Sequence, residues 1–238
     1  MKKEPKMLKN LILIAFYLVV FFAAIGGQEI SSESKVKPPA TQGSKKVNQR
    51  PVVKVSKTTT ASVPFEKANV ETMGAQCVKF ETGAGIIEFE MFPESAPESV
   101  RSFLNLAATG AFDTTTFNRV VHGFIVQGGD FATREKMTSE LDKRSRRTIP
   151  DEPNLIKHER GILSMARSDA PNSATTNFFI LVGQAQHLDG TFAAFGRVTR
   201  GMEVVDSINK MPVEGDKPTK PVRLIRVTVA PCPIHIAP

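Results

Sequence analysis

The feature that most constrains this chain is a series of short strand-like runs, separated by glycines and turns, that fills residues 76–230. Two stretches interrupt the series with helical features, 97–110 and 202–211; in the first, apolar residues recur at helical spacing between Pro97 and Gly110. Many short strands with two helices predict a mainly β domain, a closed eight-stranded antiparallel β-barrel capped by two α-helices. The strands are expected at residues 78–80, 86–92, 117–121, 124–129, 161–166, 177–182, 193–198 and 222–230.

The N-terminal segment has the pattern of an export signal. Four lysines within the first nine residues precede an unbroken apolar run over residues 11–25, and Ala24 and Gly26 are small residues suited to a cut after Gly26. The run is longer than most signal-peptide cores and shorter than most membrane spans. Residues 1–27 are therefore expected to be a cleaved signal peptide or an uncleaved membrane anchor formed by residues 11–27. Either way, the rest of the chain is expected to be exported, to the periplasm or the exterior.

The next segment, residues 28–65, is rich in Ser, Thr, Lys and Pro and shows little periodicity, which predicts a disordered linker before a folded domain at 66–238. Residues 1–65 carry eleven of the 31 Lys and Arg but only three of the 24 Asp and Glu. The formal net charge of +7 thus belongs to the leader and linker, and the predicted domain is close to neutral. Nucleic-acid binding is not expected, because its basic residues should lie on the folded face.

Five motifs, in a fixed order, carry a resemblance to a known family. The segment FNRVVHGFIVQGGDF resembles the cyclophilin signature, in which an arginine-bearing strand leads through a Gly-Phe bend to a Gln-Gly-Gly-Asp turn. The resemblance extends over about residues 76–230, and the IPDEPN and KHERG stretches are most similar to bacterial members. It implies a peptidyl-prolyl cis-trans isomerase that needs no cofactor. The motifs span residues 117–131, 161–167, 171–180, 187–198 and 201–208.

Such an enzyme has to make or break no covalent bond. Rotation about an X-Pro bond meets a barrier of about 18–20 kcal/mol that arises from amide resonance. An enzyme need only bind the twisted amide better than either planar form. In the twisted state the prolyl nitrogen regains its lone pair, so a fixed donor aimed at it stabilises the transition state selectively. Arginine suits this role, since it stays protonated and carries a rigid fork of donors.

The resemblance assigns roles to named residues. It makes Arg119, Gln127 and Phe124 catalytic: Arg119 is the donor, Gln127 binds the substrate backbone and positions the arginine, and Phe124 belongs to the hydrophobic proline pocket. Alone, Arg119 would be read as a surface ion-pair residue, and the apolar candidates would be read as core. Strand alternation separates Phe179 from its neighbour Phe178, so one face can line a groove while the other fills the core. The other substrate-binding candidates are Ile125, Ala166, Arg167, Asn177, Phe179, His187, Leu188 and Phe192.

Several positions depart from the family pattern. Asn118 replaces a histidine, Asn177 replaces a glutamine, His187 stands where drug-sensitive relatives have tryptophan, and Phe192 stands where eukaryotic members have histidine. A charged segment at 132–148 takes the place of a glycine-rich loop. These changes leave a second interpretation open, a proline-binding chaperone or assembly module with weak or no isomerase activity.

Other chemistries lack support in the sequence. The four histidines, at 122, 158, 187 and 235, have no metal-ligand spacing, and neither a nucleophile elbow nor a phosphate-binding or dinucleotide-binding motif is present. The expected partners are proline-containing polypeptides, without metal or nucleic acid. Contact with a membrane is expected only through the leader, and the chain is expected to be a monomer.

The two cysteines flank the predicted strands, Cys77 just before the first and Cys232 just after the last. In the cyclophilin barrel the terminal strands lie side by side and antiparallel, which would bring these residues together. An oxidising compartment would then permit a disulfide. Two free, half-buried thiols remain the alternative.

Overall fold

The computed structural model describes residues 63–233. The predicted leader at 1–27 and nearly all of the predicted linker at 28–65 lie outside these residues. No helix within the described range is long and apolar enough to cross a membrane. The elements are α1 (Val70–Gly74), β1 (Gln76–Thr82), β2 (Gly85–Met91), α2 (Pro97–Ala108), β3 (Arg119–Val121), β4 (Ile125–Gly128), η1 (Phe131–Thr133), α3 (Ser139–Ser145), β5 (Ile162–Met165), β6 (Phe178–Leu181), η2 (Gln186–Leu188), β7 (Ala194–Arg200), α4 (Met202–Asn209), β8 (Val213–Glu214), β9 (Lys217–Pro218) and β10 (Leu224–Pro231).

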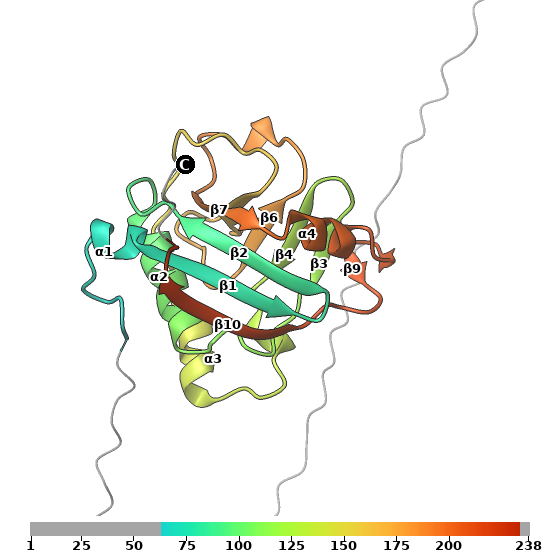
Figure 1. The fold of residues 1–238 in the computed structure, drawn as a ribbon, viewed down its shortest axis with the longest axis horizontal. Helices are drawn as coiled ribbons and strands as arrows, with labels where there is room; N and C mark the ends of the chain where they lie inside the picture. The colour runs from blue at the N-terminus through green and yellow to red at the C-terminus, as the bar shows by residue number, and fades with distance from the viewer. Residues whose placement is uncertain (1–62, 234–238) are drawn as a thin grey trace, which may run out of the picture. The chain divides into compact units, whose positions relative to one another are not determined.

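Eight of the strands form one curved sheet in the order β10-β1-β2-β7-β5-β6-β4-β3, with every neighbouring pair antiparallel (Figure 1). This confirms the predicted mainly β, eight-stranded fold. The predicted closure of the barrel is wrong, because β3 and β10 are the two edges of the sheet and do not pair as strands. Strand β3 has only three residues. Hydrogen bonds join the edges just before it instead, as where the Phe117 N–H donates to the Val222 carbonyl at 2.9 Å.

The two predicted helices are present as α2 and α4, which lie near opposite ends of β1 and β2 (Figure 1). Pro97 occupies the first turn of α2, where its missing N–H costs no hydrogen bond. The structure adds two short helices that the sequence did not predict, α1 and α3. Helix α3 lies in the charged 132–148 segment, and the Thr138 hydroxyl caps it by accepting from the Leu141 N–H at 3.2 Å.

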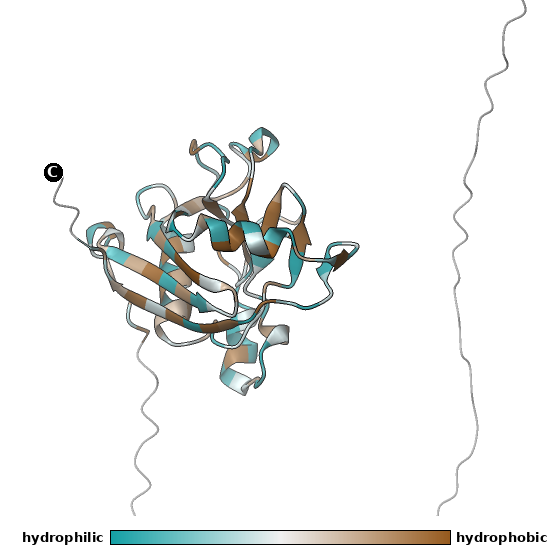
Figure 2. Ribbon diagram, turned by 45° about the vertical axis from the view of Figure 1, so that its right-hand side comes forward, coloured by the Kyte–Doolittle hydropathy of each residue, from teal (hydrophilic) through white to brown (hydrophobic). Residues whose placement is uncertain are grey.

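The main core lies between the sheet and α2 and is built from phenylalanines. Along the strands hydrophobic residues are interspersed with hydrophilic ones (Figure 2), as expected for a sheet with one buried face. Phe178 of β6 is fully buried, and its ring centroid lies 5.5 Å from those of Phe80, Phe103 and Phe112. Phe178 and Ile180 belong to this core, whereas the alternating residue Phe179 belongs to a second, smaller cluster on the other face.

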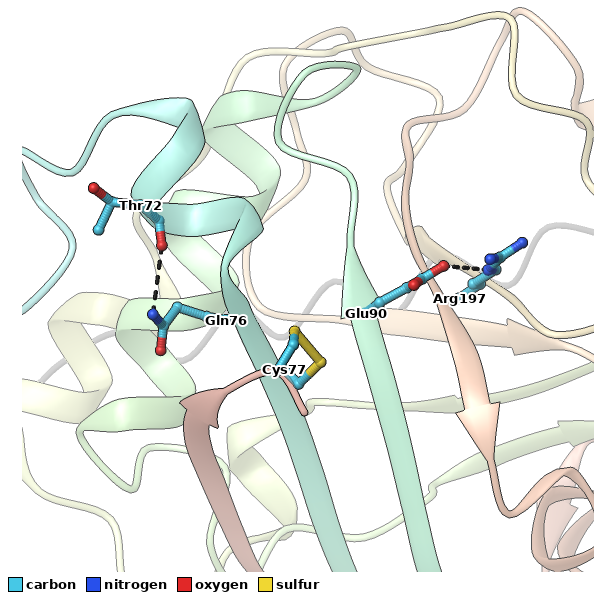
Figure 3. The surroundings of a disulfide bond; sticks show 6 residues. Thr72, Gln76, Cys77, Glu90 and Arg197 are labelled. Carbon is cyan, nitrogen blue, oxygen red and sulfur yellow. Dashed lines mark hydrogen bonds and ion pairs between the residues drawn. A yellow bond between two sulfur atoms is a disulfide. The ribbon is translucent and has the colours of Figure 1, made fainter. Parts of the chain in front are cut away.

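A disulfide joins Cys77 to Cys232, whose Cα atoms are 4.8 Å apart (Figure 3). Strands β1 and β10 are antiparallel neighbours, and the Cys232 N–H extends their ladder by donating to the Ala75 carbonyl at 2.9 Å. The disulfide thus joins the C-terminal end of the edge strand β10 to the beginning of β1. It closes a long loop, with a sequence separation of 155 residues.

We expect the protein recovered from an oxidising compartment to contain this bond. Mass measurement after alkylation without reduction should show no labelled cysteine, and replacing both cysteines with Ala should lower the free energy of unfolding by about 2–4 kcal/mol. Two labelled thiols in the unreduced protein would contradict the assignment.

Candidate active site

The β3–β4 hairpin sets the position of the predicted catalytic pair. Arg119 on β3 lies directly opposite Gln127 on β4 in the antiparallel register. Their side chains therefore stand on the same face, and an Arg119 Nη1 donates to Gln127 Oε1 at 3.4 Å. Gln127 in turn pairs with Phe179 on β6, so three adjacent strands present these side chains together.

These residues open onto a pocket of about 150 Å³. Three strands and the segments that follow β5 and contain η2 contribute to its lining, although they are far apart in the sequence. Of the eleven predicted catalytic and substrate-binding residues, nine line this pocket: Arg119, Phe124, Ile125, Gln127, Ala166, Arg167, Phe179, Leu188 and Phe192.

The floor of the pocket is apolar and firmly packed. Ile125, Phe179 and Leu188 are buried within the second hydrophobic cluster, with Phe124 and Phe192 packed against it and partly exposed. The rings of Phe179 and Phe192 pack edge to face, with their centroids 6.0 Å apart. A ring-sized apolar group such as proline can therefore be held against fixed side chains.

Arg167 also lines the pocket, where its guanidinium is held by neighbouring groups. It lies 5.0 Å from the centroid of the Phe192 ring and donates to the Ser168 and Thr191 carbonyls at 3.0 and 3.3 Å. These contacts tie the segment after β5 to the segment that carries Phe192.

Two predicted substrate-binding residues, Asn177 and His187, do not line the pocket. Asn177 lies just before β6, and its carbonyl accepts from the N–H of the pocket-lining residue Ala166 at 3.0 Å. His187 is exposed on η2, with its ring 5.5 Å from that of Phe124. Both residues adjoin the site, but their side chains are not part of the pocket surface.

A buried polar chain supports the η2 side of the pocket. His158, which is 1% exposed, lies with Nδ1 3.3 Å from Asp189 Oδ1 and Nε2 3.1 Å from Ser164 Oγ. Burial lowers the pKa of His158 below its ordinary value, and the neighbouring Asp189 carboxylate only partly offsets this. Asp189, His158 and Ser164 resemble the catalytic triad of a hydrolase. Ser164, however, is fully buried and donates to the Ala193 carbonyl, so the role of these three residues is structural.

One charged neighbour of the site was not predicted from the sequence. Asp216, in the turn between β8 and β9, contacts the Arg119 guanidinium through Oδ2, at 3.1 Å from Nε and 3.0 Å from Nη2. It lies 97 residues from Arg119, and nothing in its local sequence signals that contact. Asn118, by contrast, does not line the pocket, and its Nδ2 donates to Asp130 Oδ2 at 3.4 Å.

The comparisons with known proteins agree with this geometry. A family model described as cyclophilin type peptidyl-prolyl cis-trans isomerase/CLD matches residues 77–229. Peptidyl-prolyl cis-trans isomerase CYP18-1 of Arabidopsis thaliana is 39% identical over 159 residues, covering 66% of this chain and 98% of that protein. Peptidyl-prolyl cis-trans isomerase B of Escherichia coli is 35% identical over 168 residues, covering 64% of this chain and 99% of that protein.

A solved structure gives the same result. A cyclophilin type peptidyl-prolyl cis-trans isomerase of Cryptosporidium parvum superposes with a TM-score of 0.59 at 29% identity, covering 66% of this chain and 99% of that chain. The family model, the two relatives and the solved structure therefore agree. The chain belongs to the cyclophilin family and is a peptidyl-prolyl cis-trans isomerase.

Proposed function

We propose that Arg119 catalyses isomerisation by donating a hydrogen bond to the prolyl nitrogen of the twisted peptide bond, while the proline ring occupies the apolar floor formed by Ile125, Phe179 and Leu188. The observation that carries this proposal is that one pocket places the Arg119 guanidinium beside a buried apolar floor. The donor acts on a lone pair that exists only while the amide is twisted, so it lowers the barrier without tightening ground-state binding.

Gln127 has two roles in this proposal. Its Oε1 holds an Arg119 N–H, and the amide group of the same side chain is available to the substrate backbone beside the pocket. No proton is transferred and no covalent intermediate forms, so the rate should not require a titrating group in the pocket. The proposal is tested by a proline-limited peptide assay that compares the wild-type protein with the Arg119→Ala variant.

We further propose that the substrates are X-Pro bonds of exported proteins during folding. The support lies in the sequence, where a lysine-rich start and the apolar run at 11–25 precede the catalytic domain. These residues lie outside the described part of the chain. A cleaved signal peptide would release a periplasmic or secreted enzyme, and an uncleaved leader would tether the same domain to the membrane.

Expression of the full chain in a bacterial cell tests this location. We expect the isomerase domain outside the cytoplasm, with a mass that lacks residues 1–26 if the leader is cut after Gly26. Replacing Leu18 and Val19 with Arg should retain the protein in the cytoplasm, because it interrupts the apolar run. Wild-type protein that stays in the cytosol at full length would contradict the proposal.

A further inference from the structure

The β8–β9 hairpin is attached to the strand that carries Arg119. The Val120 N–H donates to the Asp216 carbonyl at 2.8 Å, so the backbone of the turn is fixed against the outer edge of β3. This hydrogen bond places the Asp216 side chain next to Arg119, the residue before Val120. Its Oδ2 then contacts both Nε and Nη2 of Arg119, at 3.1 and 3.0 Å.

From this arrangement we infer that Asp216 is a positioning residue, which holds the Arg119 guanidinium in the orientation that donates to the prolyl nitrogen. The inference rests on the proposed role of Arg119 and adds a residue that regulates the geometry of the same site. Asp216 itself does not line the pocket, so it acts through Arg119 rather than on the substrate.

The need for such a residue follows from the exposure of the arginine. The Arg119 side chain is 43% exposed and has a long, flexible stem, so an unrestrained guanidinium would sample many orientations. Gln127 holds it from one side through Nη1, and Asp216 holds it from the other through Nε and Nη2. Of its five N–H groups, these contacts use three, and the other two have no partner among residues 63–233 and can donate to the substrate.

The same exposure argues against a purely structural role. Asp216 is 52% exposed, and ion pairs between such exposed side chains contribute little to folding stability. The anchoring bond from Val120 uses the Asp216 backbone, so a side-chain substitution leaves it in place. A change at Asp216 should therefore alter the orientation of Arg119 while the domain stays folded.

The experiment compares kcat and KM of the full-length wild-type protein and three variants in the proline-limited peptide assay. Asp216→Asn keeps the size of the side chain but removes its charge, and we expect kcat to fall about tenfold while KM changes less than about twofold, because the reacting groups are misaligned. Asp216→Glu keeps the carboxylate and should recover part of that loss. Glu214→Gln, which removes a neighbouring exposed carboxylate of the same hairpin, is the matched control and should retain the wild-type kcat.

A double-mutant cycle separates this inference from the proposed function. If Asp216 acts through Arg119, Asp216→Asn should have no further effect on kcat once Arg119 is Ala. Full activity of Arg119→Ala would overturn the proposed mechanism itself. Two outcomes would overturn only the positioning role. In the first, Arg119→Ala is impaired but Asp216→Asn keeps the wild-type kcat. In the second, Asp216→Asn lowers kcat by the same factor whether residue 119 is Arg or Ala.

Discussion

Replacing Arg119 with Ala is expected to lower kcat/KM for an X-Pro peptide by about 10²–10³-fold, the usual loss when one preorganised transition-state donor is removed. The side chain is 43% exposed and belongs to no hydrophobic cluster, so the domain should remain folded. Arg119→Lys should recover only a small part of the rate, because a compact ammonium group lacks the planar fork whose separate nitrogens contact Asp216 and Gln127 and leave donors for the substrate.

The matched control is Arg226→Ala, which removes an exposed arginine from the edge strand β10 without changing the pocket lining. This variant should keep the wild-type kcat/KM, measured in the same peptide assay with circular dichroism to verify folding. Equal losses in the two variants would show that general surface charge, rather than the Arg119 donor, controls the rate.

Replacing Phe178 with Ala should have the largest effect on stability, about 3–5 kcal/mol in the free energy of unfolding, because a fully buried aromatic ring is replaced by a cavity. Phe178 contacts rings from β1, from α2 and from the segment after α2, at centroid distances of 5.5 Å. The cavity would lie at the junction of these elements, where little can collapse to fill it.

Urea unfolding of the purified protein measures this change. Phe124→Ala serves as the comparison, since Phe124 is only partly buried at the pocket rim, and its cost should stay near the typical value of about 1 kcal/mol. A Phe178→Ala variant no less stable than Phe124→Ala would contradict the assignment of Phe178 to the centre of the core.

The fold was predictable where the sequence carries a clear period. The run at 86–92 alternates and forms β2, and the prediction at 177–182 brackets β6. Helix α3 had no such signal, because none of its residues is buried and only the Thr138 cap marks its start. Closure of the barrel depends on whether the two edge strands pair with each other, which no local pattern specifies; β3 has only three residues and does not pair with β10.

The site was predictable for the same reason. Alternation and the family motifs together place Gln127 and Phe179 on the pocket side of their strands, where the structure has them. Asn177 and His187 lie outside regular strands, so the directions of their side chains depend on loop geometry. Asp216 reaches Arg119 only through the docking of the β8–β9 hairpin on β3, a contact between distant segments.

The central claim is that Arg119 recognises the twisted peptide bond and not the planar one. NMR exchange spectroscopy tests this most directly, by measuring both the affinity for an X-Pro peptide and the cis-trans exchange rate of the bound peptide, in wild-type protein and in Arg119→Ala. We predict that Kd will stay within about twofold while the exchange rate on the protein falls by about 10²-fold or more. Exchange that persists at the wild-type rate in the variant, or a loss of exchange fully explained by weaker binding, would contradict the account.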